Sequence, residues 1–213
     1  MGNVKKLLVT TLTLALFLTS VQTAFATFKD VKETHENYAA INYVQAEGIV
    51  IGYNDGTYRP ENKINRAEFT KIIIASRFSV EEIDKCYENE IAEKQTKVFF
   101  NDVLKTDWYG KYICVAKNQN IIKGFDDNTF RPLNRISFAE AAKIIAVAFG
   151  AQIGAETEPW YKIYVEALAG TKSIPMSIYS FDQQLSRGEM AEIIYRFLAD
   201  VNDKPYKTYA DLQ

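Results

Sequence analysis

Residues 52–60 read Gly-Tyr-Asn-Asp-Gly-Thr-Tyr-Arg-Pro, and residues 124–132 read Gly-Phe-Asp-Asp-Asn-Thr-Phe-Arg-Pro. The two stretches lie 72 residues apart, and a motif on either side of each keeps this offset. Phe-Lys-Asp-Val at residues 28–31 recurs as Phe-Asn-Asp-Val at 100–103, and Ile-Asn-Arg-Ala-Glu at 64–68 recurs as Ile-Ser-Phe-Ala-Glu at 136–140. Three motifs that share one offset indicate an internal duplication, the pattern of a repeat protein.

Each copy begins with a predicted helix followed by a turn. Residues 38–47 and 111–118 repeat apolar side chains at helical spacing. The turn contains Asn-Asp-Gly at residues 54–56, a sequence typical of tight turns, and its flanking aromatics predict short strand-like segments.

A second helix is predicted after the turn, and its start occurs three times in the chain. Residues 65–68, 137–140 and 186–189 begin with Asn or Ser and end with Glu. This is the capping-box pattern, in which both side chains accept hydrogen bonds from free backbone N–H groups. An apolar stripe follows each box, and one two-helix unit cannot bury such a stripe alone. Three units are therefore expected to stack.

The third copy is degenerate, and one segment interrupts the pattern. Trp-Tyr at residues 160–161 matches Trp-Tyr at 108–109, but residues 172–180 replace the turn sequence. Residues 79–98 separate the first two copies and are predicted to form an inserted helix and a loop. We predict a mainly α protein of helix–loop–helix repeats with short β-like turns.

The first 26 residues have the three parts of a secretory signal peptide: Lys5 and Lys6, an uncharged apolar stretch, and Ala-Phe-Ala at residues 24–26. The apolar stretch is short for a bilayer, which needs about 20 residues, so a retained membrane anchor is the alternative. Cleavage after Ala26 removes two of 25 basic residues and none of 27 acidic ones, which changes the net charge from −2 to −4.

Export determines how the two cysteines, Cys86 and Cys114, are interpreted. Cysteines outside the cytoplasm tend to pair. A bridge across 28 residues would stabilise the fold by roughly 3–4 kcal/mol on the chain-entropy model. We expect a Cys86–Cys114 disulfide, and two separate buried thiols are the alternative.

Composition argues against several classes of function. A near-neutral, slightly acidic chain lacks the excess of Lys and Arg that nucleic-acid binding needs. One His and two Cys are too few ligands for a typical His/Cys metal site, so no metal or cofactor is expected. No Ser-His-Asp set or phosphate-binding loop occurs, so the chain is not expected to be an enzyme. An exported glycosidase with an Asp/Glu pair stays open, since such pairs have no local sequence signature.

Arg66 and Arg187 are the strongest candidate ligand-binding residues. Each lies in the first turn of a predicted helix, where the helix dipole disfavours a cation and capping does not require one. Free N–H groups beside a guanidinium form a ready anion site, and Arg suits a planar carboxylate. A salt bridge between repeats is the alternative. Trp108 and Trp160 could stack on a sugar or pack in the core.

Together these motifs resemble the S-layer homology domain. Its pattern runs from Phe-x-Asp-Val through a Trp- or Tyr-led helix and Gly-Tyr-x-Asp-Gly-Thr-Phe-Arg-Pro to Ile-Thr-Arg-Ala-Glu. The resemblance implies a pseudo-threefold helical bundle of three such repeats. The expected segments are a signal peptide at 1–26, repeats at 27–78, 99–150 and 151–202, an insertion at 79–98 and a tail at 203–213.

The resemblance also implies a function. Such modules attach exported proteins noncovalently to cell-wall polysaccharide, often one that carries ketal-linked pyruvate, in grooves between repeats. The Arg of the motif meets the acid group, a role that falls on Arg66 and Arg187, with Gly52, Asp55 and Trp108 or Trp160 near the grooves.

The expected partner is an anionic cell-wall glycan at the cell surface, with other S-layer proteins as further candidates. Nucleic acid and, after signal cleavage, membrane are not expected partners. The alternative function is a structural S-layer subunit or adaptor that uses the bundle for protein–protein assembly. Phe138 in place of the second Arg puts one groove in doubt.

Overall fold

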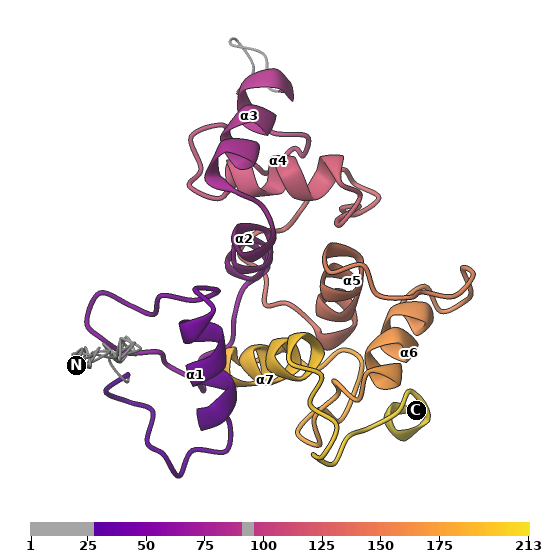
Figure 1. The fold of residues 1–213 in the computed structure, drawn as a ribbon. Coiled ribbons are helices and arrows are strands. Elements are labelled where there is room, and N and C mark those ends of the chain that lie inside the picture. The colour runs from indigo at the N-terminus through magenta and orange to yellow at the C-terminus, as the bar shows by residue number, and fades with distance from the viewer. Residues whose placement is uncertain (1–27, 91–95) are drawn as a thin grey trace, which may run out of the picture.

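The computed structural model describes residues 28–90 and 96–213, which are mainly helical (Figure 1). The elements are α1 (Tyr38–Ala46), α2 (Arg66–Arg77), α3 (Val80–Glu90), α4 (Gly110–Asn118), α5 (Phe138–Ala148), α6 (Lys162–Gly170), α7 (Arg187–Leu198) and the 3-10 helix η1 (Ala210–Leu212). The predicted mainly α class is confirmed. The predicted signal peptide lies outside the described residues. Within them, no helix is both long and apolar enough to cross a membrane.

The second helix of each predicted repeat lies near the centre, and the first lies outside it. Figure 1 shows α2, α5 and α7 around the middle of the molecule, with α4, α6 and α1 at the periphery. The pairing crosses the repeat boundaries, because α4 packs on α2, α6 on α5, and α1 on α7. Each lobe therefore combines helices from two repeats, and the contact between α1 and α7 closes the ring.

A closed set of backbone hydrogen bonds joins the starts of the three central helices. The N–H of Ile64 donates to the carbonyl of Leu185 at 3.0 Å, and the N–H of Leu185 donates to the carbonyl of Ile136 at 3.0 Å. The N–H of Ile136 donates back to the carbonyl of Ile64 at 3.1 Å, and all three side chains are buried. Equivalent residues thus meet around a pseudo-threefold axis, as the resemblance implied.

All three predicted capping boxes are present. The side chains of Asn65, Ser137 and Ser186 accept from the backbone N–H of Glu68, Glu140 and Glu189, and each Glu side chain accepts from the N–H of its capping residue. These bonds satisfy donors that a helix start otherwise leaves free. The three glutamates therefore have the structural role that the pattern predicts.

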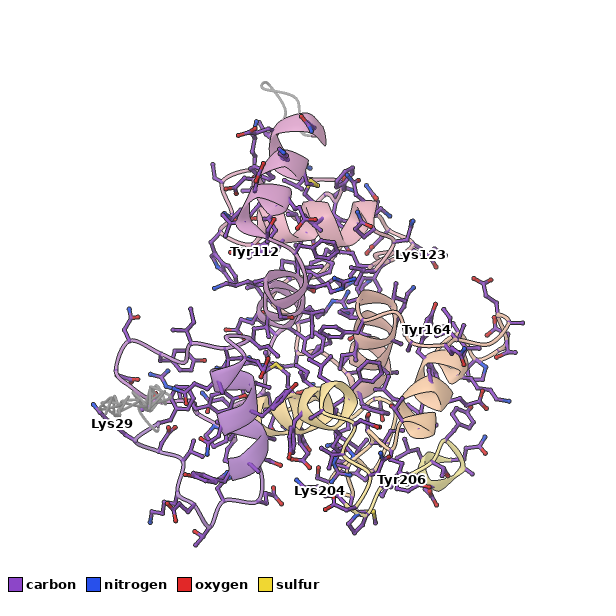
Figure 2. All side chains as sticks on the ribbon, in the orientation of Figure 1. Lys29, Tyr112, Lys123, Tyr164, Lys204 and Tyr206 are labelled. Atoms are coloured by element: carbon purple, nitrogen blue, oxygen red, sulfur yellow. A yellow bond between two sulfur atoms is a disulfide. The ribbon has the colours of Figure 1, made fainter. Side chains whose placement is uncertain are left out.

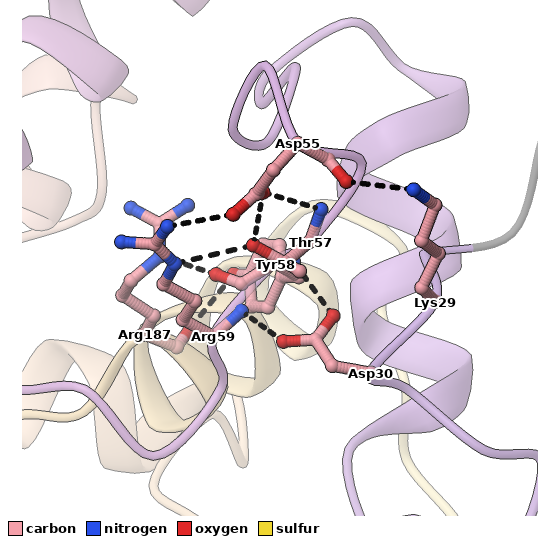
Figure 3. Close-up of polar contacts among 7 residues, drawn as sticks. All are labelled: Lys29, Asp30, Asp55, Thr57, Tyr58, Arg59 and Arg187. Atoms are coloured by element: carbon pink, nitrogen blue, oxygen red, sulfur yellow. Dashed lines mark hydrogen bonds and ion pairs between the residues drawn. The ribbon is translucent and has the colours of Figure 1, made fainter.

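The loop at residues 52–60 is tied to the motif that begins its repeat. The N–H groups of Tyr58 and Arg59 donate to the Asp30 carboxylate at 2.8 and 2.7 Å (Figure 3). Asp102 accepts two equivalent bonds in the second repeat. The prediction of strand-like segments beside the turn is wrong, because these N–H groups bond to a carboxylate instead of a partner strand. The described residues contain isolated β-bridges and no strand.

The inserted segment forms α3, which packs on α4. Cys86 of α3 and Cys114 of α4 form the predicted disulfide. Two further contacts hold α3 in place: the Tyr87 hydroxyl donates to the carbonyl of Lys105, and Lys111 pairs with Asp84 at 2.9 Å. The insertion is thereby fixed beside the segment that leads into α4.

Candidate functional site: two clusters between repeats

Arg187 begins α7 and lies beneath the loop of the first repeat. Its Nε donates to the carbonyl of Tyr58 at 2.8 Å, and the Tyr58 hydroxyl donates to the carbonyl of Arg187 at 2.8 Å (Figure 3). The guanidinium carbon lies 4.9 and 4.7 Å from the ring centroids of Tyr53 and Tyr58. Within the described ranges, Arg187 has no ion-pair partner. A buried cation is therefore held by rings and a carbonyl without a counter-charge.

Arg66 has the same position beneath the loop of the second repeat. Its Nε donates to the carbonyl of Phe130 at 2.9 Å, and its guanidinium lies over Phe125 and Phe130 at 4.9 and 4.8 Å. It also pairs with Glu140 at 2.7 Å. Burial lowers the pKa of Arg66, and the charge of Glu140 opposes this effect. The salt bridge between repeats, which the sequence left as the alternative, is present at Arg66 and absent at Arg187.

A lysine and a tryptophan accompany each arginine. Lys143, three residues after Glu140, has its ammonium 5.9 Å from the Trp160 ring, and the equivalent Lys71 lies 5.7 Å from the Trp108 ring. Trp108 and Trp160 are 55% and 47% exposed, so neither is a core residue. Sequence reasoning missed both lysines. Their signal was a Lys three residues after the capping Glu in the first two repeats.

We define two clusters from these contacts. Cluster 1 comprises Tyr53, Glu68, Lys71, Trp108 and Arg187, and cluster 2 comprises Phe125, Glu140, Lys143, Trp160 and Arg66. All five residues of cluster 2 line one cavity of about 790 Å³. Lys123 and Tyr164, labelled in Figure 2, line the same cavity from the second loop and from α6. In cluster 1, Tyr53 and Glu68 line a cavity of about 520 Å³.

The pKa of Lys143, the lysine of cluster 2, is lowered by its surroundings. Burial lowers the pKa of Lys143, and the nearby Lys123 lowers it further, whereas Glu156 raises it. The cavity thus holds charges of both signs close together. The residues that the structure describes contain no group of His, Cys, Asp and Glu able to hold a metal ion.

The third equivalent position between repeats, where α7 meets the start of α1, lacks this set of residues. Phe138 replaces the arginine, Glu192 replaces the lysine, and Glu36 stands where the tryptophan is expected. Glu192 is buried and pairs with Arg196 at 2.7 Å and with Lys204 at 2.8 Å. These positions contribute to internal packing, so the molecule has two clusters of this kind in its described part.

Gly52 and Asp55, which were expected near the grooves, shape the first loop. Gly52 has φ +79°, and a Cβ there would lie 2.2 Å from Cε1 of Phe28, so no side chain fits. The Asp55 carboxylate accepts from the N–H and hydroxyl of Thr57 at 3.0 and 2.6 Å and pairs with Arg59 at 2.8 Å (Figure 3). These contacts explain the loop geometry, while ligand binding by either residue stays a prediction.

Comparison with known proteins supports the resemblance. The sequence profile of the S-layer homology domain matches residues 27–70 and 99–142. The chain carries two S-layer homology domains. The profile does not match the degenerate copy at 151–202, which stays a prediction.

Two relatives are named for the cell wall or the surface layer, and a third is named a cellulosome-anchoring protein. The chain is 32% identical to the middle cell wall protein of Brevibacillus brevis over 68% of its own length and 14% of the relative. It is 33% identical to the surface layer protein of Brevibacillus choshinensis, over 68% and 13%. It is 35% identical to the cellulosome-anchoring protein of Acetivibrio thermocellus, over 56% and 25%. The chain thus spans a quarter or less of these relatives, and the matches support a cell-wall or cell-surface location.

Proposed function

We propose that this chain is a non-catalytic module that attaches to the cell wall by binding an anionic polysaccharide at clusters 1 and 2. The observation that carries this proposal is a set of three residues that occurs in both clusters: a buried arginine bonded to a loop carbonyl, a lysine and a half-exposed tryptophan. A guanidinium can hold a carboxylate through two hydrogen bonds. An exposed indole offers an apolar face on which a sugar ring can lie.

The net charge of the chain implies that individual, well-placed cations, and not bulk attraction, would bind an anionic glycan. After signal cleavage the chain would carry a net charge of −4, so bulk attraction to an anionic glycan is unfavourable. Clusters 1 and 2 each place two cations beside an aromatic wall. Ketal-linked pyruvate on the glycan would supply the carboxylate that such a cluster fits.

Sedimentation with purified cell walls tests the proposal. Because both arginines are buried, the main variant is K71A with K143A, which spares the contacts beneath the loops. The matched control is K85A with K162A, which removes two lysines outside the clusters. We expect wall binding to fall at least about tenfold in the first variant and to persist in the control. The proposal is wrong if a folded R66A and R187A double variant still binds walls like the parent.

A structural role is the second candidate function. It rests on the relatives named surface layer protein and cellulosome-anchoring protein. In that case the purified chain would form sheets or filaments without wall glycan, which electron microscopy would show, and the K71A and K143A variant would assemble normally.

A further inference from the structure

Clusters 1 and 2 are built from equivalent residues but differ in charge. The cavity of cluster 2 is lined by the basic residues Arg66, Lys123 and Lys143 and by the acidic residues Asp126, Glu140, Glu156 and Glu158. Three positive charges thus face four negative ones, and the wall has a net charge of −1.

The equivalent positions of cluster 1 carry a different balance. Lys123 and Asp126 correspond, 72 residues earlier, to Ile51 and Asn54, so one charge of each sign is absent.

The segment before the tryptophan accounts for most of the difference in net charge between the two clusters. Glu156, Thr157 and Glu158 precede Trp160, and Leu104, Lys105 and Thr106 precede Trp108 at the same spacing. Asp107 stands where cluster 2 has Pro159, so the equivalent positions of cluster 1 carry Arg187, Lys71 and Lys105 against Glu68 and Asp107, a net charge of +1.

The arginines differ in the same direction. In cluster 2 the Arg66 guanidinium is paired with Glu140 at 2.7 Å, so an incoming carboxylate would compete with an anion already in place. In cluster 1 the corresponding carboxylate belongs to Glu68, which makes no ion pair with Arg187. A carboxylate can therefore approach Arg187 without displacing an ion-pair partner.

We propose that the two clusters bind different sugar residues of the wall glycan: cluster 1 takes the residue that carries the acid group, and cluster 2 takes a residue without an acid group. This inference rests on the proposed function, because it divides one ligand between two sites. Glu156 and Glu158 determine the specificity of cluster 2 by repelling an anion. Lys71 and Arg187 determine that of cluster 1 by attracting one.

The chain provides a separate reporter for each cluster. Trp108 and Trp160 are its two tryptophans, so each indole N–H signal in an NMR titration reports one site. The probes are a hexose glycoside with ketal-linked pyruvate, which is an anion, and the methyl ester of that pyruvate, which is neutral. We expect the acid to shift the Trp108 signal at a concentration at least about fivefold lower than the Trp160 signal. Such a factor matches one unit charge at about 4 Å in water. The ester should lose this preference.

Reciprocal substitutions provide the second test. E156Q with E158Q changes two exposed side chains and should strengthen acid binding at Trp160 about fivefold, with no change at Trp108. L104E with T106E, also at exposed positions, gives cluster 1 the acidic segment and should weaken acid binding at Trp108 while leaving Trp160 unchanged.

The outcomes separate this inference from the proposed function. Equal affinity of the acid at both tryptophans, or tighter binding at Trp160, overturns the division between clusters while leaving glycan binding intact. Silence of both indole signals toward both probes, together with absent wall sedimentation, overturns the proposed function itself.

Discussion

At the scale of single residues, Arg66 and Arg187 each hold a loop of the neighbouring repeat in addition to being candidate ligand-binding residues. The sequence indicated only the second role. Their position in the first turn of a helix predicted a task other than capping. The structure shows that one guanidinium nitrogen of each is used by a loop carbonyl of the next repeat in the ring. A helix pattern cannot reveal such a bond, because the loop is 64 residues away for Arg66 and 129 for Arg187.

Asp55 provides a prediction about pH. Hydrogen bonds from Thr57 and pairing with Arg59 lower the pKa of its carboxyl from 3.8 to about 2. Because the ionised form is favoured in the fold, its contribution to loop stability is complete above about pH 4 and is lost as the pH falls through 2. We expect the Thr57 amide signal to move with a midpoint near pH 2 in an NMR titration.

The D55N variant should remove that transition. The equivalent Asp127 also has a lowered pKa through Thr129 and Arg131, so its loop serves as the internal control. A Thr57 midpoint near pH 4 in the parent would show that the carboxylate does not hold the loop.

At the scale of elements, the insertion α3 supports the wall of cluster 1. The Tyr87 hydroxyl would lie 3.0 Å from a Cβ at position 110, so α3 packs closely against the start of α4. Trp108 lies two residues before that start. Residues 79–98 were predicted to contain a helix and a loop, and α3 is that helix. The placement of α3 beside Trp108 depends on the predicted Cys86–Cys114 disulfide, for which the sequence left two separate buried thiols as the alternative.

Removing the disulfide should therefore affect the two clusters unequally. In C86A with C114A, we expect the free energy of unfolding to fall by about 3 kcal/mol, since the bridge spans 28 residues. Looser packing of α3 should weaken probe binding at Trp108 and leave binding at Trp160 unchanged. Chemical denaturation and the indole titration measure the two effects. Equal losses at both tryptophans would mean that α3 supports the whole bundle rather than cluster 1.

At the scale of the whole molecule, the repeats were predictable and their partners were not. Capping boxes and apolar stripes are local patterns, so the starts of α2, α5 and α7 could be predicted from residues 65–68, 137–140 and 186–189. An offset of 72 residues is the same whether a helix packs within its repeat or against the next one. The exchange of outer helices, and with it the joining of Arg187 to the first loop, is therefore a property of the closed ring.

Because the contact between α1 and α7 closes the ring, removing helices at the C-terminal end of the chain should destabilise α1 at the N-terminal end. A chain that ends at residue 150 lacks α6 and α7, so α1 loses the surface on which it packs. Ala40, Ile41 and Val44 are buried in the parent, and exposing side chains of this size costs about 1–3 kcal/mol each. We expect hydrogen exchange in α1 to accelerate by at least about a hundredfold, while α4, which packs on α2 and α3, stays protected.

A chain that ends at residue 202 is the matched control, because it keeps α1 to α7 and loses only the tail. Its α1 amides should exchange about as slowly as those of the parent. If α1 stayed protected in the chain that ends at residue 150, each repeat would be stable with its own helices, and the degenerate third repeat would not be needed to complete the first. If α1 alone becomes labile, the third repeat is retained for closure, which explains why it keeps a capping box and a buried Leu185 without a binding cluster of its own.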